Sequence, residues 1–206
     1  MLDLDQVGVR LDGRWVVRDI DLVCPAGESI AVVGANGAGK TTLLRIVAGI
    51  LPLDRGFITL AGQPLRGATR RRVGFVPEAA DPPPFLTARD LLALCAALRD
   101  APIPDDDQRR RLYPAALEDA RIGTMSLGER RRVCLAAALV GDPAVLVLDE
   151  PENGLDAAGT ETLISLLRDA CARGAIVLVA THDAALRSAL DCRELRLESG
   201  RLAAAG

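Results

Sequence analysis

A glycine-rich segment, Gly34-Ala-Asn-Gly-Ala-Gly-Lys40-Thr41, restricts what this chain can fold into more than any other feature. It follows the apolar run Ser29–Val33 and precedes Thr41–Ala48, where apolar residues recur with helical spacing up to Gly49. In the order strand, loop, helix, the pattern GxxxxGK(S/T) brings backbone N–H groups together around phosphate oxygens at the N-terminus of a helix. The segment therefore predicts a phosphate-binding loop; the alternative is a glycine-rich turn that binds nothing.

Two side chains complete the predicted loop. Lys40 is placed to reach the β- and γ-phosphates of a nucleotide, and the Thr41 hydroxyl is placed to ligate Mg²⁺. Of the 25 basic residues 24 are Arg, so the single Lys40 is expected where a guanidinium does not fit. The residues predicted to hold the nucleotide are Gly34, Ala35, Asn36, Gly37, Ala38, Gly39, Lys40, Thr41 and Thr42.

The composition is that of one globular domain. The chain has 206 residues, of which 50% are apolar and 26% charged, and its net charge is −3. The longest apolar runs, Leu91–Leu98 and Val133–Val140, are 8 residues each, whereas a membrane-spanning helix needs about 20. The first residues, MLDLDQ, include acids where a secretory signal has basic residues, so we expect a cytoplasmic protein. The cysteines at 24, 95, 134, 171 and 192 form no CxxC pair and are expected to be reduced, with no zinc cluster.

Short apolar segments alternate with segments of helical spacing. The expected strands are 2–9, 15–23, 29–33, 56–60, 72–76, 145–148 and 175–180, and the expected helices are 41–48, 87–99, 108–119, 127–140 and 156–172. Continuous apolar strands separated by helices indicate a parallel sheet covered on both faces. We expect a single α/β domain, with a core formed by about 1–77 and 141–206 and a helical insertion at about 78–140.

Two acids follow the apolar strand Val145–Leu148. In an open α/β sheet the carboxyl ends of the strands face the ligand, so Asp149 and Glu150 are expected near the phosphates. Asp149 would hold Mg²⁺, directly or through water, and Glu150 would polarise an attacking water. Polar residues also follow many strands simply because the chain leaves the core there. The joint occurrence with the phosphate loop is what favours hydrolysis.

Three further segments occur in order along the chain. Met125-Ser126-Leu127-Gly128-Glu129-Arg130 is similar to an LSGGQ signature, Asn153-Gly154-Leu155-Asp156 to a D-loop, and His182 in Thr181-His182-Asp183 to a switch histidine. With the two motifs above, this set resembles the ATP-binding cassette (ABC) ATPases, the nucleotide-binding subunits of ABC transporters, over essentially the whole chain. The resemblance implies a P-loop NTPase core, with a mostly parallel sheet and a small N-terminal antiparallel β-subdomain, and a helical insertion subdomain.

The resemblance also implies roles for individual residues. Ser126 and Gly128 would contact the γ-phosphate of ATP, Asp156 would belong to the nucleotide site, and His182 would contact the γ-phosphate during catalysis. Each segment has a simpler alternative. Ser126 caps the helix that follows, Asn153–Asp156 is a tight turn that ends in a helix cap, and His182 is a surface or core imidazole. The cofactors implied are ATP and Mg²⁺.

In this family the signature of one cassette completes the nucleotide site of another. The resemblance therefore implies a second ABC ATPase subunit, in a homodimer or a heterodimer, and an integral membrane transporter subunit that the cassette powers as a peripheral protein on the inner face of the cell membrane. The short helical insertion and the signature segment are more similar to those of cassettes in small export systems than to those of cassettes in importers. The alternative function is a soluble cassette ATPase that acts on ribosomes or DNA. A guanine-nucleotide switch is excluded because the sequence has no NKxD motif.

Two positions depart from the family pattern. Glu78 occupies the position of the Q-loop glutamine of the family. Its carboxylate is expected to ligate Mg²⁺ and to take part in catalysis, although it adds negative charge beside the triphosphate. Leu11 occupies the position where many family members have an aromatic residue that stacks on adenine. It lies four residues before the only Trp, Trp15. Trp15 either supplies the stack or packs on the β-subdomain, and packing is favoured.

Charged and proline-rich segments are expected at the surface. Arginine runs at 70–72, 109–111 and 130–132 predict solvated faces rather than a nucleic-acid site, because the chain is acidic and lacks a basic stripe with interleaved aromatics. Arg132 matches a commonly basic family position after the signature. Between Glu78 and about Asp90 family members receive a helix of the membrane subunit. There, Pro82–Pro84 and Phe85 form either part of that socket or a stiff loop.

Overall fold

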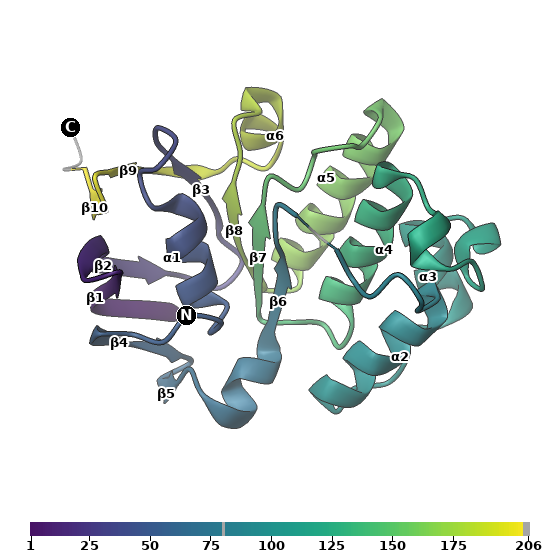
Figure 1. Ribbon diagram of the computed structural model, residues 1–206, viewed down its shortest axis with the longest axis horizontal. Helices are drawn as coiled ribbons and strands as arrows, with labels where there is room; N and C mark the ends of the chain where they lie inside the picture. The colour runs from purple at the N-terminus through teal and green to yellow at the C-terminus, as the bar shows by residue number, and fades with distance from the viewer. Residues whose placement is uncertain (80, 204–206) are drawn as a thin grey trace.

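Two β-sheets with helices packed around them form the computed structural model, which describes residues 1–79 and 81–203 apart from the side chains at 107 and 108 (Figure 1). The strands of the larger sheet are β3 (Ser29–Val33), β6 (Val73–Val76), β7 (Val145–Asp149), β8 (Ile176–Ala180), β9 (Arg193–Glu198) and β10 (Arg201–Leu202). Their order is β10-β9-β3-β8-β7-β6, and every pair from β9 to β6 is parallel. The expected mostly parallel sheet is confirmed.

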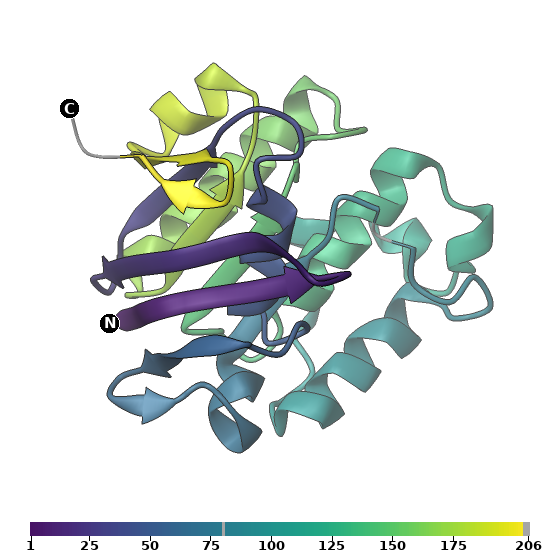
Figure 2. The ribbon, with the colours of Figure 1, turned by 60° about the vertical axis from the view of Figure 1, so that its left-hand side comes forward.

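The smaller sheet is antiparallel and lies toward the N-terminus. It contains β1 (Leu2–Leu11), β2 (Arg14–Cys24), β4 (Arg55–Leu60) and β5 (Gln63–Pro64), in the order β2-β1-β4-β5. Along β1 and β2 most apolar side chains face the core and most polar ones face out, as alternation in the sequence predicts; Leu11 and Val23 are exposed. Figure 2 shows this sheet in front of the helix that follows the glycine-rich loop.

Helices cover both faces of the larger sheet. On one face α1 (Lys40–Val47) packs between the two sheets, and its Leu43 and Ile46 join a core with Ile20 and Val147. On the other face α5 (Ala157–Ala172) and α6 (Ala184–Ala189) pack through Leu163 and other apolar residues against β7 and β8. All residues of these two central strands are buried, which explains why Val145–Leu148 and Ile176–Ala180 are continuously apolar rather than alternating.

A helical layer extends from one edge of the sheet, on the right of Figure 1. It contains α2 (Ala88–Arg99), α3 (Asp106–Leu112) and α4 (Leu127–Leu139), which share an apolar cluster. Both longer helices begin with a reciprocal capping box, Thr87 with Asp90 and Ser126 with Glu129. These caps determine where each helix starts.

The helix expected at 108–119 is wrong in its extent. The structure has α3 at Asp106–Leu112, followed by a separate 3-10 turn at Ala115–Leu117. Pro114 lies between them. Proline lacks a backbone N–H and disfavours helical geometry in the residue before it, so the helix ends and the chain changes direction.

Several short elements have no counterpart in the sequence analysis. They are β5, β9, β10, α6 and three 3-10 turns. In β9 charged residues alternate with leucines at the sheet edge and only Leu197 is fully buried, so its local pattern is weak. The described residues include no helix that is long and apolar enough to cross a membrane. The five cysteines are free thiols.

Candidate functional site

The glycine-rich loop and the acidic ends of the central strands line a cleft of about 700 Å³. It lies at the carboxyl ends of β7 and β8 and at the N-terminus of α1, which is the ligand edge of a parallel sheet. The residues that line the cleft are Val16, Asn36, Gly37, Gly39, Lys40, Thr41, Thr42, Glu78, Asp149, Glu150, Glu152, Asn153 and His182. Residues from five separate segments of the chain therefore meet here.

Close packing and backbone geometry explain two of the loop glycines. A Cβ atom at Gly34 would lie 2.3 Å from the carbonyl oxygen of Leu197, so a larger residue would push the loop away from β9. Gly39 is the N-cap residue of α1 and has a φ of 104°, a conformation that favours glycine. No side chain caps the N-terminus of this helix, and its first turn contains no acidic residue. The first N–H groups of α1 are thus left for a ligand, and the positive end of the helix dipole favours an anion there.

The Lys40 side chain curls back over the loop. Its Nζ donates to the carbonyl oxygens of Gly34, at 2.9 Å, and Ala35, at 3.3 Å. These bonds hold the ammonium at the cleft wall, within the loop that its own backbone helps to form. Gly34, Ala35 and Ala38 belong to the loop without lining the cleft, while the other predicted loop residues line it.

Asp149 presents an unsatisfied carboxylate oxygen at the floor of the cleft. Its side chain is 2% exposed, and its Oδ2 has no hydrogen-bond partner among the described residues. Burial raises the pKa of Asp149, while hydrogen bonding to Thr41 lowers it and the negative charge of Glu78 raises it. A buried, unpartnered carboxylate oxygen beside a hydroxyl and a second carboxylate is a donor set that suits a hard divalent cation. The residues present therefore fit Mg²⁺.

Glu150 is held in a constrained backbone conformation beside His182. Its φ is 45°, and its backbone N–H donates to Ala180 at 2.8 Å. The His182 backbone N–H donates to Glu150 Oε2 at 3.4 Å, and His182 Nε2 lies 3.4 Å from Oε1. Burial and the nearby Glu152 raise the pKa of Glu150, and the His182 contacts oppose that rise. The Glu150 side chain is 14% exposed and His182 is 63% exposed, so the imidazole covers the carboxylate from the open side.

Glu152 is a cleft residue that the sequence analysis missed. Its Oε1 accepts a short hydrogen bond from the Thr181 hydroxyl, and its Oε2 is buried with no partner in the described part of the chain. The available signal was a third acid at the same strand end, two residues after Glu150. Its proximity to Thr181 could not be read from the sequence, because that contact joins the ends of β7 and β8.

The predicted nucleotide-site residues of the signature and D-loop segments, Ser126, Gly128 and Asp156, also lie outside this cleft. Ser126 accepts from the Glu129 N–H at 3.3 Å and caps α4, as its simpler interpretation expects. Asp156 caps α5 and pairs with Arg132 at 2.6 Å. The chain therefore does not bring its own signature segment to its own phosphate loop.

Trp15 does not line the cleft, but its neighbour Val16 does. The Arg10 guanidinium stacks 4.2 Å from the centre of the Trp15 ring, and the ring approaches Gly8. Leu11 is exposed. Successive residues of a strand point to opposite faces, so Trp15 packs on the small sheet while Val16 faces the loop.

The expectation of solvated faces for the arginine runs is wrong for 130–132. Arg131 is buried, and Arg130 and Arg132 are partly buried in ion pairs with Asp81 and Asp156. Three basic residues in sequence resemble a surface run. Here they contact the two loops that follow β6 and β7, because successive helical positions are rotated by about 100° and point in different directions. The run at 70–72 is exposed as expected.

Comparisons with known proteins give a consistent result. A family model described as ABC transporter matches residues 17–153. The Nod factor export ATP-binding protein I of Burkholderia pseudomallei (strain K96243) is 38% identical over 216 residues, which cover 100% of this chain and 70% of that protein. The protein of the same name from Bradyrhizobium diazoefficiens is 36% identical over 209 residues, which cover 96% of this chain and 68% of that protein.

Two solved structures have similar folds. One, an ATP-binding subunit of an ABC transporter, has a TM-score of 0.86 and 26% identity, and the match covers 100% of this chain and 89% of that one. The other is a dimeric ATP-binding cassette in a post-hydrolysis state, bound to ADP and Pi. It has a TM-score of 0.87 and 21% identity, and covers 98% of this chain and 96% of that one.

Proposed function

Because this chain belongs to the ABC transporter family as one of its ATP-hydrolysing cassettes, we propose that it powers export through a separate membrane-spanning subunit. The observation that carries the proposal is the cleft, where an uncapped helix N-terminus, Lys40 and the buried Asp149 carboxylate, one oxygen of which has no partner among the described residues, meet beside Glu150. The family match and the export proteins among the relatives support it.

The phosphates of ATP bind to the glycine-rich loop. Its N–H groups and the dipole of α1 hold the phosphate oxygens, and the Lys40 ammonium moves from the Gly34 and Ala35 carbonyls to the β- and γ-phosphates. Thr41, Asp149 and Glu78 would hold Mg²⁺, which would supply charge neutralisation for the phosphate oxygens. Phosphate binding by these groups orients the γ-phosphate toward the acidic end of β7.

Glu150 acts on the attacking water. Its raised pKa, due first to burial, suits a group that accepts a proton from water, and the His182 backbone N–H holds one carboxylate oxygen in place. The exposed His182 ring contacts the γ-phosphate and closes the site over Glu150. Proximity and charge stabilisation account for most of the catalysis in such phosphoryl transfers.

A second cassette completes the site. This proposal is supported by the position of Ser126, which is exposed at the N-terminus of α4 and lies outside its own chain's cleft. The amides at a helix N-terminus can hold a partner's γ-phosphate there, together with Gly128. Head-to-tail pairing gives two such sites, in a homodimer or with a similar cassette.

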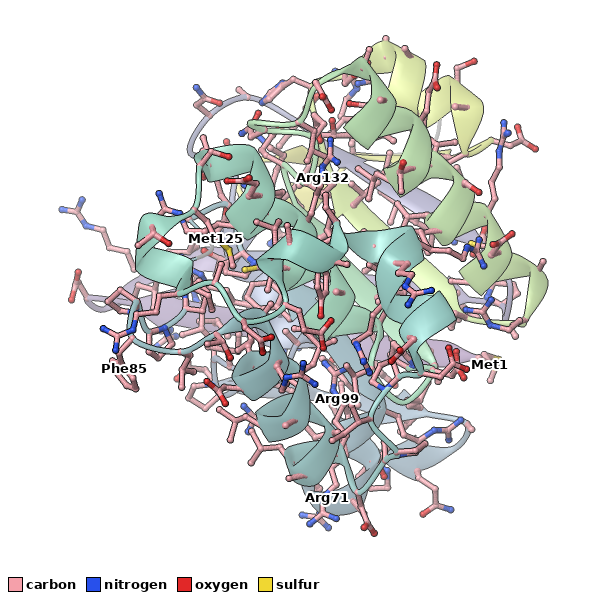
Figure 3. All side chains as sticks on the ribbon, turned by 90° about the vertical axis from the view of Figure 1, so that its right-hand side faces the viewer. Met1, Arg71, Phe85, Arg99, Met125 and Arg132 are labelled. Atoms are coloured by element: carbon pink, nitrogen blue, oxygen red, sulfur yellow. The ribbon has the colours of Figure 1, made fainter. Side chains whose placement is uncertain are left out.

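The membrane subunit docks beside the proline-rich segment. Phe85 is 71% exposed and projects from the edge of the molecule (Figure 3). The first part of the same segment contributes Pro77 and Pro82 to a groove of about 270 Å³, which Phe75 and Leu91 also line. An exposed aromatic and a largely apolar groove on one segment suit a helix end of a membrane protein. This docking holds the cassette at the inner face of the membrane.

The proposed transport role is tested by purifying the tagged chain from membranes and identifying any membrane-spanning protein that copurifies with it. We expect a stable complex whose ATPase activity responds to reconstitution in vesicles, and Phe85→Asp should release the chain without lowering its basal activity. Recovery of the chain with ribosomes or DNA, and not with membranes, would instead support the alternative function.

Glu78→Gln should change the dependence of ATP turnover on Mg²⁺. A carboxylate ligand attracts the cation more strongly than a neutral amide does, so we expect the half-saturating Mg²⁺ concentration to rise roughly threefold. Turnover is measured across a Mg²⁺ series, with Glu161→Gln on the exposed face of α5 as control. An unchanged Mg²⁺ dependence contradicts the role of Glu78 as a ligand.

Selectivity for the base should be weak. With exposed Leu11 in place of an aromatic, the base loses a stacking contribution of about 1–3 kcal/mol, so ATP and GTP should bind with affinities within about threefold of each other. Both affinities are measured by calorimetry on the chain and on Leu11→Tyr, which should bind both nucleotides more tightly. A preference for ATP of about tenfold or more would rule this out.

A further inference from the structure

Arg131 is a buried arginine that joins three segments of the chain. It lies in the second turn of α4 and is 3% exposed. Its Nη1 donates to the Pro77 carbonyl at 2.8 Å, its Nη2 to the Glu78 carbonyl at 2.6 Å, and its Nε to the Asn153 carbonyl at 3.4 Å. Each nitrogen of the guanidinium thus has a different carbonyl as its partner.

The three acceptors belong to the two loops that line the cleft opposite the phosphate loop. Pro77 and Glu78 follow β6, and Asn153 follows Glu150 at the end of β7. Glu78 and Asn153 both line the cleft. Arg131 therefore lies behind the catalytic wall and fixes the backbone of one loop relative to the other.

The guanidinium geometry is what this position requires. Burial lowers the pKa of Arg131, while the negative charges of Glu152, Glu78 and Asp149 raise it. Burying a charge is costly unless its hydrogen bonds are satisfied, and here backbone carbonyls satisfy them. A rigid planar fork can reach both loops at once, whereas the single ammonium of a lysine cannot keep the same directions.

The first turns of α4 make further contacts with the same segments. Arg130 pairs with Asp81 at 3.2 Å, and Arg132 pairs with Asp156 at 2.6 Å. A Cβ atom at Gly128 would lie 2.5 Å from the carbonyl oxygen of Gly154, so helix and loop are in close contact. The helix that begins at Ser126 is thus attached to both catalytic loops of its own chain.

We propose that Arg131 is a positioning residue for ATP hydrolysis, which holds the Glu78 loop and the loop after Glu150 in register with the N-terminus of α4. The inference rests on the roles proposed above for Glu78 and Glu150. It concerns turnover rather than phosphate binding, because Arg131 does not line the cleft.

Arg99 offers a matched control. It too is an arginine that donates to three backbone carbonyls, those of Ala137, Ala138 and Val140, at 3.1, 2.8 and 2.7 Å. Those acceptors lie at the C-terminal end of α4, and Figure 3 shows Arg99 well apart from Arg132. Burial lowers the pKa of Arg99 as it does that of Arg131. Replacing it removes a comparable set of bonds away from the catalytic loops.

The test compares Arg131→Met, Arg131→Lys and Arg99→Met in the full chain, by kcat, KM for ATP, ATP affinity and Tm. Displacing catalytic groups by about 1 Å can cost about 100-fold in rate, so we expect kcat to fall at least about 10-fold in both Arg131 variants, with ATP affinity changed less than about threefold. Arg99→Met should lower Tm but keep kcat within about twofold when measured well below Tm. Arg131→Lys retains the charge and keeps the test valid if Arg131→Met does not fold.

Three outcomes overturn the inference. They are a normal kcat in a folded Arg131 variant, recovery of kcat by Arg131→Lys, which would indicate charge alone, and an equal loss of kcat in Arg99→Met. Failure of the proposed function is distinguished by Glu150→Gln measured in parallel. If Glu150→Gln retains turnover, the catalytic assignment fails whatever Arg131 does. If Glu150→Gln loses turnover and the Arg131 variants keep it, the catalytic assignment of Glu150 stands and the inference about Arg131 is overturned.

Discussion

Glu150→Gln is expected to lower the steady-state ATP turnover of this chain by about 100-fold or more while ATP affinity stays within about twofold. A positioned general base contributes about 100- to 10,000-fold, and the amide cannot accept the proton of the attacking water. The substitution keeps the shape of the side chain and its hydrogen bond from the His182 backbone N–H, so the cleft should remain intact. Because bound ATP is no longer consumed, the two-cassette assembly should accumulate.

The measurements are turnover by phosphate release, affinity by calorimetry, and oligomeric state by size-exclusion chromatography with ATP. Glu152→Gln is the matched comparison. It removes a negative charge of the same kind two residues further along the chain, from a side chain that hydrogen-bonds to Thr181. We expect it to cost less than about tenfold, because that carboxylate is engaged elsewhere. Turnover near wild type in Glu150→Gln would show that Glu150 is not the base, and a larger loss in Glu152→Gln would transfer the role to Glu152.

Lys40→Arg is expected to weaken ATP binding almost as much as Lys40→Ala does. The ammonium lies within hydrogen-bond distance of the Gly34 and Ala35 carbonyls, in a loop that closes around it. A planar guanidinium is larger and directs its donors differently. Hydrogen bonds to charged groups contribute about 1.5–3 kcal/mol, so the Kd for ATP should rise about 10- to 100-fold in both variants.

Calorimetric titration with ATP measures this effect, and Tm shows whether the fold is kept. Arg45→Lys, an exposed change on the same helix α1, serves as the control and should leave affinity unchanged. If Lys40→Arg binds ATP like wild type, any cation suffices at this position. The scarcity of lysine in the chain would then reflect composition alone.

Local patterns predicted the elements that surround the phosphates. The strand Ser29–Val33 is followed directly by the glycine-rich loop and the start of α1. The apolar run, the glycines and the helical spacing that predict these elements therefore all lie within about twenty residues. The capped start of α2 at Thr87 was equally local. The helix at 108–119 was placed too far along the chain because helical spacing was extended across Pro114, which ends α3.

The sequence by itself determined the phosphate loop, the acidic end of β7 and the parallel sheet, because each follows from neighbouring residues and the period of burial. The tertiary structure alone decided which distant groups meet: Glu152 with Thr181, and Arg131 with the carbonyls of Pro77, Glu78 and Asn153. It also showed that the run of arginines at 130–132 is not a solvated face. These contacts join segments separated by 22 to 54 positions, and their partners are mostly backbone carbonyls, which every residue carries and no sequence pattern can mark.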